Sequence, residues 1–137
     1  MAGRSVFALC AYERAHPLEA LKAALRAHSI EMCSAKTCEE VERLLSQTQP
    51  ELIFTDTILP DGSWADIVRL AENSPAPANV VVVGACADTK LYISAMEHGA
   101  FDFILPPFEE KPLTHVLQVA VENVRRRRGE LAVKAVA

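Results

Sequence analysis

The chain has 137 residues, of which 50% are hydrophobic and 23% are charged, and its formal net charge is −4. This length suits one domain with a single hydrophobic core, and so high an apolar content excludes a mainly disordered chain. No apolar run approaches the roughly 20 residues that are needed to cross a bilayer, which predicts a soluble cytoplasmic domain that does not bind membranes. The negative net charge argues against nucleic-acid binding, because domains that bind nucleic acids are normally basic.

Short apolar runs alternate along the chain with longer segments of helical periodicity. Strand-length runs occupy residues 6–11, 30–33, 52–55, 80–83 and 101–105. Between them, apolar residues recur at three- and four-residue steps, which predicts helices that bury one face. Five strand–helix units in alternation predict an α/β domain with a parallel sheet and helices on both faces. The domain is expected to span residues 1–128, with a tail or linker at 129–137.

Several residues mark the expected ends of these helices. Thr37 followed by Glu40 predicts a capping box at the start of the second helix, in which side chains satisfy unpaired backbone amides. Asp88 is expected to cap the fourth helix, and Gly99 to end it.

Asp56 is the first candidate for chemistry. It directly follows the apolar run 52–55 and precedes a Leu-Pro-Asp-Gly turn at 59–62. In doubly wound sheets, ligands bind at the carboxyl ends of the strands. A carboxylate at that position is therefore a candidate functional group, and the turn is expected to give the following loop a defined shape.

Two segments resemble the receiver domains of two-component signalling. Residues 50–62 (PELIFTDTILPDG) are similar to the phosphoacceptor segment of that family, and residues 97–108 (EHGAFDFILPPF) are similar to its fifth strand and the proline that follows. The resemblance extends over residues 5–127, with both motifs in the family's order. It implies a flavodoxin-like, doubly wound sheet of five parallel strands in the order 2-1-3-4-5, with five helices.

The resemblance also implies roles for individual residues. The residue that matches Asp56 receives a phosphoryl group in receivers, and Mg²⁺ is held there by this aspartate, by an acidic pair after the first strand and by the backbone carbonyl that matches Ile58. Phe103 occupies the position of an aromatic residue that changes rotamer on activation. The bond between Pro106 and Pro107 is expected to be cis.

The sequence departs from the family pattern at most of the chemical positions. The acidic pair falls on Ala11 and Tyr12, so that only Glu13 offers a nearby carboxylate. The hydroxyl residue that ends strand four falls on Gly84, and the lysine that ends strand five falls on Pro106. Because Mg²⁺ is usually held by one or two carboxylates and phosphate oxygens, we expect weak Mg²⁺ binding and no tightly bound cofactor. Without these preorganised charges, phosphorylation of Asp56 should be impaired or absent.

These departures predict a pseudo-receiver rather than an enzyme. We expect it to act through contacts with a sensor histidine kinase, a phosphotransfer protein or an effector domain. Its expected contact face is the fourth helix, fifth strand and fifth helix, where Lys90, Glu97 and Asp102 are candidate charged contacts and where a homodimer could form. With Gly84 in place of the hydroxyl residue, Phe103 is interpreted as a packing residue.

Two other functions compete with this interpretation. One is a phospho-competent receiver in which Glu13 substitutes for the acidic pair. The other is a flavodoxin-like flavin or nucleotide binder, which is disfavoured because the five glycines form no phosphate-binding loop. The basic run 125–128 is interpreted as helix-end arginines that complement the macrodipole rather than as a nucleic-acid patch.

Overall fold

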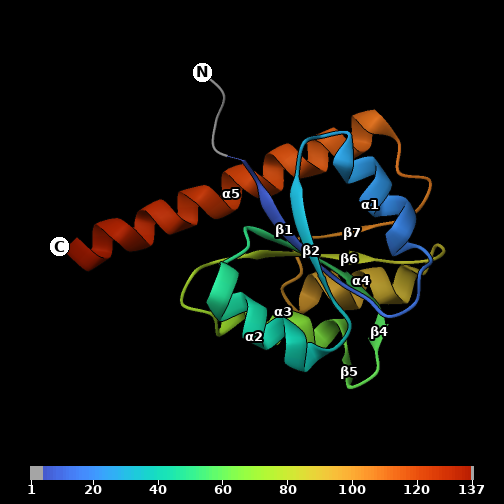
Figure 1. Ribbon diagram of the computed structural model, residues 1–137, viewed down its shortest axis with the longest axis horizontal. Helices are drawn as coiled ribbons and strands as arrows, with labels where there is room; N and C mark the ends of the chain where they lie inside the picture. The colour runs from blue at the N-terminus through green and yellow to red at the C-terminus, as the bar shows by residue number, and fades with distance from the viewer. Residues whose placement is uncertain (1–4, 137) are drawn as a thin grey trace.

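The protein folds around one parallel sheet of five strands, as Figure 1 shows for the computed structural model, which describes residues 5–136. The strands of this sheet are β1 (Phe7–Ala11), β2 (Glu31–Ala35), β3 (Leu52–Asp56), β6 (Asn79–Val83) and β7 (Asp102–Ile104). They lie side by side in the order β2-β1-β3-β6-β7. The five predicted strands are therefore confirmed, and so is the flavodoxin-like order 2-1-3-4-5.

Five helices connect the strands and cover both faces of the sheet. They are α1 (Leu18–Arg26), α2 (Cys38–Thr48), α3 (Trp64–Glu72), α4 (Thr89–Glu97) and α5 (Glu110–Val136). Helices α1 and α5 pack on one face, and α2, α3 and α4 pack on the other (Figure 1). This division confirms the predicted doubly wound α/β architecture.

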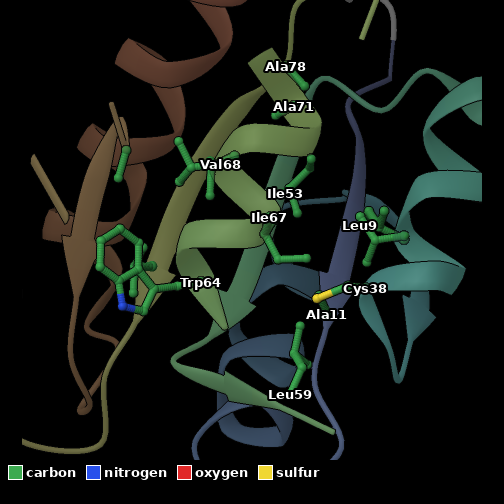
Figure 2. Close-up of a cluster of buried hydrophobic side chains, with 14 of the residues drawn as sticks. Leu9, Ala11, Cys38, Ile53, Leu59, Trp64, Ile67, Val68, Ala71 and Ala78 are labelled. Carbon is green, nitrogen blue, oxygen red and sulfur yellow. The ribbon is translucent and has the colours of Figure 1, made fainter. Parts of the chain in front are cut away.

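Successive residues of the central strands point to opposite faces and build two separate cores. In β3, Leu52 and Phe54 belong to the core under α1 and α5, whereas Ile53 belongs to the core under the other three helices. Figure 2 shows this second core, in which Trp64 and Ile67 of α3 pack toward the sheet. Because helices cover both faces, the strands need apolar residues at every position.

The helix ends agree with most of the predicted signals. The Thr37 hydroxyl accepts a hydrogen bond from the Glu40 amide at 3.1 Å, and Asp88 caps α4. The reciprocal half of the predicted capping box is absent, because the Glu40 carboxylate accepts from the Lys36 amide instead. Gly99 ends α4 with a φ of 102°, a left-handed conformation that glycine adopts without strain.

Helix α5 is longer than predicted. We expected a tail or linker from Gly129, but the helix continues without interruption to Val136. Gly129 does not stop the helix. A Cβ placed on it would meet nothing within 4 Å, and glycine inside a helix is less favourable than alanine by only about 1 kcal/mol. An ion pair between Arg126 and Glu130 at 3.6 Å spans this position on the helix surface.

The remaining parts of the predicted ranges, residues 1–4 and residue 137, lie outside the described residues. Within residues 5–136, no helix combines the length and the apolar character that a membrane crossing requires.

The turn that follows β3 forms a small hairpin. Its two strands are β4 (Ile58–Leu59) and β5 (Gly62–Ser63), which pair antiparallel with Ile58 opposite Ser63. The predicted defined loop is therefore present, although its two short strands were not predicted. The hairpin leads directly into α3, whose first turn is closed by a capping box between Ser63 and Asp66.

Candidate functional site

Asp56 lies at the carboxyl edge of the sheet, on its central strand. It is the last residue of β3, which pairs with β1 on one side and β6 on the other. The residue is only 1% exposed. A carboxylate so deeply buried needs a counter-charge or several hydrogen bonds, because removing a charged group from water is otherwise costly.

Arg14 provides that counter-charge. From the loop between β1 and α1, its Nε donates to Asp56 Oδ2 at 3.1 Å and its Nη2 donates to Oδ1 at 2.9 Å. This two-pronged geometry is among the strongest that arginine forms with a carboxylate. The Arg14 side chain is 58% exposed, so the guanidinium covers the carboxylate from the solvent side. Arg14 was not predicted as a site residue.

Thr57 completes the hydrogen bonding of the Asp56 carboxylate. The Thr57 amide donates to Oδ1 at 2.7 Å, and the Thr57 hydroxyl lies 3.5 Å from the same oxygen. Within the described residues, no fully buried side-chain nitrogen or oxygen lacks a hydrogen-bond partner. The site is therefore satisfied by groups of the chain itself.

The positions that match the acidic pair offer Asp56 no carboxylate. Ala11 is buried at the end of β1, and Tyr12 is buried beside α1. The Tyr12 hydroxyl donates to Glu19 and accepts from Lys22 Nζ at 2.9 Å. The hydrogen bond from Tyr12 is the main cause that lowers the pKa of Glu19. Glu13 is exposed in the loop that follows.

These residues do not fit a bound Mg²⁺ ion. Mg²⁺ needs several oxygen ligands in octahedral geometry, but both oxygens of Asp56 already accept hydrogen bonds from Arg14. Across residues 5–136, no three His, Cys, Asp or Glu side chains are grouped so that they could hold a metal ion. Ile58, whose carbonyl the family pattern assigns to the metal, lies in β4 with its side chain exposed.

Phe103 fills the space beside Gly84. A Cβ placed on Gly84 would lie 2.7 Å from Phe103 Cζ and 2.9 Å from Leu105 Cδ2, closer than real atoms approach. Phe103 is 9% exposed, and its ring forms a T-shaped contact with the ring of Tyr92, with centroids 6.0 Å apart. The aromatic residue therefore belongs to the core, and no side chain at position 84 competes with it.

Pro106 follows β7 at the position where the family pattern places a lysine. It carries no charge and no donor, and its bond to Pro107 is cis. A second cis bond joins His16 to Pro17 in the loop that carries Arg14, and it was not predicted from the sequence.

Asp61 ties the β4–β5 hairpin to α2. Its carboxylate accepts hydrogen bonds from the backbone amides of Cys38 at 2.7 Å and Glu39 at 3.1 Å, at the start of the helix. The bond from the Cys38 amide is the main cause that lowers the pKa of Asp61. The turn of the hairpin that follows Asp56 is thus anchored to the start of α2.

The basic run of α5 binds the opposite, amino-terminal edge of the sheet. Arg125 forms an ion pair with Glu51, and Arg127 donates to Asn79. Arg128 donates to the carbonyl oxygens of Pro77 at 2.8 Å and Pro50 at 2.9 Å. Three of the four arginines therefore hold α5 against the amino-terminal edge of the sheet. Because α5 continues to Val136, residues 125–128 lie inside the helix, whereas they were predicted to lie at its end.

Comparison with known proteins places this geometry in context. Residues 9–118 match the family described as the response regulator receiver domain. The response regulator protein PilR of Pseudomonas aeruginosa is 29% identical over 103 residues, which are 75% of this chain and 23% of PilR. The transcriptional regulatory protein CitB of Klebsiella pneumoniae is 29% identical over 84 residues, which are 61% of this chain and 36% of CitB. The chain thus spans well under half the length of these relatives.

Solved structures show the same fold. A response regulator from Thermotoga maritima is 26% identical and superposes with a TM-score of 0.73, covering 87% of this chain and 99% of that one. The signal receiver domain of an HD domain-containing protein from Pseudomonas fluorescens is 18% identical with a TM-score of 0.79, covering 94% and 96%.

Proposed function

Because the chain belongs to the response regulator receiver domain family, we propose that it is a receiver module that signals mainly through protein contacts and whose Asp56 accepts phosphoryl groups poorly or not at all. One observation carries this proposal: the Asp56 carboxylate is bound by Arg14 of the same chain, and residues 5–136 contain no group of three His, Cys, Asp or Glu side chains that could hold a metal ion.

The state of the Asp56 oxygens opposes nucleophilic attack. A carboxylate that attacks phosphorus needs a free oxygen lone pair aimed at the donor. Here Oδ1 accepts from Arg14 and from the Thr57 amide, and Oδ2 accepts from Arg14. Oδ2 accepts only from Arg14, so a phosphodonor would have to approach this oxygen beside the guanidinium that covers it from the solvent side.

The positions around Asp56 that bind the phosphoryl group in receivers would also fail to neutralise its negative charge. A phosphoryl group carries about −2 charge, and catalysis of its transfer is mainly positioning and electrostatic stabilisation. Gly84 offers no side-chain donor, and Pro106 offers no charge. Removing a single preorganised donor costs about 3–4 kcal/mol of transition-state stabilisation in other enzymes, so the combined losses support a rate lower by orders of magnitude.

The conformational switch is weakened for a related reason. A ligand shifts a two-state equilibrium only if it binds the two states differently. In receivers a hydroxyl residue moves toward the phosphoryl group and an aromatic side chain follows, but here the Phe103 ring already lies against Gly84. Phosphorylation of Asp56 would thus do little to change the rotamer of Phe103.

The proposed contact face consists of α4, β7 and α5. On α4, Tyr92, Ile93 and Met96 are exposed apolar side chains, and Ala95 is the buried residue of that helix. Lys90 is exposed near the start of the same helix. Apolar side chains grouped on one surface helix favour docking to another protein. Its partners are a histidine kinase, a phosphotransfer protein, an effector domain or a second copy of the chain.

Charged groups at the rim of this face would set the specificity of docking. Glu97 is exposed at the end of α4. Asp102 is half-buried in β7, where it accepts a hydrogen bond from the Phe103 amide at 2.8 Å. Glu97 is therefore the freer of the two carboxylates for pairing with a partner.

Intact-mass measurement tests this function. The wild-type chain and the variants Asp56→Asn and Glu13→Gln are incubated with acetyl phosphate and Mg²⁺, beside a phospho-competent receiver as a positive control. We expect the control to gain the mass of one phosphoryl group and the wild-type chain to gain none. A wild-type adduct that disappears in Asp56→Asn would contradict the proposal. Its loss in Glu13→Gln as well would establish the competing function, in which Glu13 replaces the acidic pair.

A further inference from the structure

We propose that Arg14 determines the cation specificity of this site, because its guanidinium takes the place of a divalent metal ion and keeps such ions away from Asp56. This assignment rests on the proposed function, since it explains why a receiver with an intact acceptor aspartate would not use Mg²⁺. It makes Arg14 a specificity-determining residue.

The first support is the use of the carboxylate oxygens. A carboxylate offers about four lone-pair positions. On Asp56, the Arg14 Nε and Nη2 donors and the Thr57 amide take three of them. A divalent ion would need at least one of the oxygens that Arg14 binds, and it would bring a +2 charge close to the guanidinium. Binding of the metal and binding of Arg14 should therefore be mutually exclusive.

The second support is the origin of Arg14. It lies in the loop after β1, three residues beyond Ala11, and so in the segment that carries the acidic pair in the family pattern. This loop therefore presents a cation where the family pattern presents anions. The exposure of the Arg14 side chain argues against a packing role, because its removal would leave no cavity in the core.

The third support comes from comparison with an ordinary surface pair. Arg69 is exposed to a similar extent, at 64%, and donates to Asp66 Oδ1 at 2.7 Å three residues earlier on α3. That pair is local, and Asp66 is itself substantially exposed. The Arg14–Asp56 pair instead joins residues 42 positions apart through two hydrogen bonds, and its acceptor is buried. Arg69 is thus a matched control for any effect of removing a surface arginine.

Mn²⁺ binding tests the assignment without any need for phosphorylation. The free-ion signal in electron paramagnetic resonance is measured for the wild-type chain and for Arg14→Ala, Arg69→Ala and Arg14→Ala/Asp56→Asn. We expect Arg14→Ala to bind Mn²⁺ roughly tenfold more tightly than the wild type, since it frees a buried carboxylate and removes a repelling charge. Arg69→Ala should match the wild type, and the double variant should lose the gain.

The same variants are also compared in an Ala11→Asp background, which adds a second carboxylate at a position of the family's acidic pair. There the effect of Arg14→Ala on Mn²⁺ affinity should be larger. Equal affinities with and without Arg14 in both backgrounds would overturn the assignment.

Nuclear magnetic resonance of the Arg14 Nε–H group gives an independent readout in the wild-type chain. We expect a resolved signal that is unchanged by Mg²⁺ and is lost in Asp56→Asn but kept in Asp66→Asn. Displacement of this signal by low millimolar Mg²⁺ would overturn the assignment. Because neither measurement uses a phosphodonor, failure of the assignment is distinguishable from failure of the proposed function, which the intact-mass measurement decides.

Discussion

Arginines bind carboxylates at both edges of the sheet, but the two edges use them differently. At the amino edge, Arg125 of α5 pairs with Glu51, which also accepts a hydrogen bond from the Phe7 amide at 3.3 Å. At the carboxyl edge, Arg14 reaches in from a loop to Asp56. In the first pair both side chains are largely covered, whereas in the second only the aspartate is covered.

This difference separates a structural role from a functional one. The amino-edge pair fixes a long helix to two strands, so its loss should weaken the whole fold. The carboxyl-edge pair fixes one loop over one carboxylate, so its loss should mainly change what that carboxylate can bind. The same chemistry thus supports stability at one edge and selectivity at the other.

The largest expected effect on stability is at the amino edge. Glu51→Ala removes the partner of Arg125 and leaves the Phe7 amide without its acceptor. Breaking a well-buried ion pair costs about 3–5 kcal/mol, and the partial exposure of Arg125 reduces this to about 2–3 kcal/mol. Urea denaturation measures the change. Glu130→Ala, which removes an exposed pair on the same helix, should cost less than about 0.5 kcal/mol. If Glu51→Ala and Glu130→Ala lowered the free energy of unfolding equally, the proposed structural role of the Arg125–Glu51 pair would be contradicted.

The second effect concerns the crowded position beside the site. Gly84→Ser restores the hydroxyl position of the family pattern but forces its Cβ against Phe103. Overpacking of this kind costs about 1–3 kcal/mol, and urea denaturation again measures it. Gly129→Ala is the matched control, because its Cβ meets open space and should stabilise α5 by about 0.5–1 kcal/mol. A Gly84→Ser variant as stable as the wild type would show that Phe103 moves aside easily.

A smaller effect tests the asymmetry of burial within the Arg14–Asp56 pair. Arg14→Ala leaves a buried carboxylate without its counter-charge and should destabilise the fold by about 1–2 kcal/mol. Asp56→Asn keeps one oxygen that can accept from Arg14 and the Thr57 amide, and the guanidinium that loses its counter-charge is exposed to water, so this variant should cost less, about 1 kcal/mol. Thermal and urea unfolding of both single variants and of the double variant check this order. The reverse order would contradict the burial argument.

The smallest effect concerns the hairpin that follows Asp56. The pKa of Asp61 lies below its ordinary value of 3.8, chiefly because the Cys38 amide donates to it. A carboxyl group with a lowered folded-state pKa stabilises the fold above its unfolded-state pKa, and this contribution is lost as the pH falls through the folded-state value. Asp61→Ala should therefore reduce stability at neutral pH and flatten its decline below pH 3.8. Glu122→Gln, at an exposed position of α5, is the control and should change stability at neutral pH by less than about 0.5 kcal/mol.

The fold was predictable because its signals are local and repeated. Apolar strands, periodic helices and the motif around Asp56 each point to the same architecture, and the structure confirms the sheet order. The length of α5 was predicted wrongly, because Gly129 suggested an end although the helix surface around it is simply exposed.

Arg14 could not be predicted in the same way. Glu13 and Arg14 are adjacent residues of opposite charge in one loop, and the sequence does not determine which side chain turns toward Asp56. One physical signal was available: a buried carboxylate whose acidic neighbours are replaced by Ala11 and Tyr12 needs a positive charge from a nearby loop. Position 106 offers no such charge, because a proline replaces the family lysine there. The loop after β1, which contains Arg14, does offer one.

The central claim is that Asp56 is held by Arg14 and not by a divalent metal ion. A crystal structure of the wild-type chain grown with Mg²⁺ and beryllium fluoride, a mimic of the phosphoryl group, tests it most directly. The account predicts that the Arg14 guanidinium remains within hydrogen-bond distance of both Asp56 oxygens, with no metal ion or fluoride adduct at the carboxylate. A Mg²⁺ ion bound to Asp56, with Glu13 among its ligands and Arg14 turned away, would contradict it.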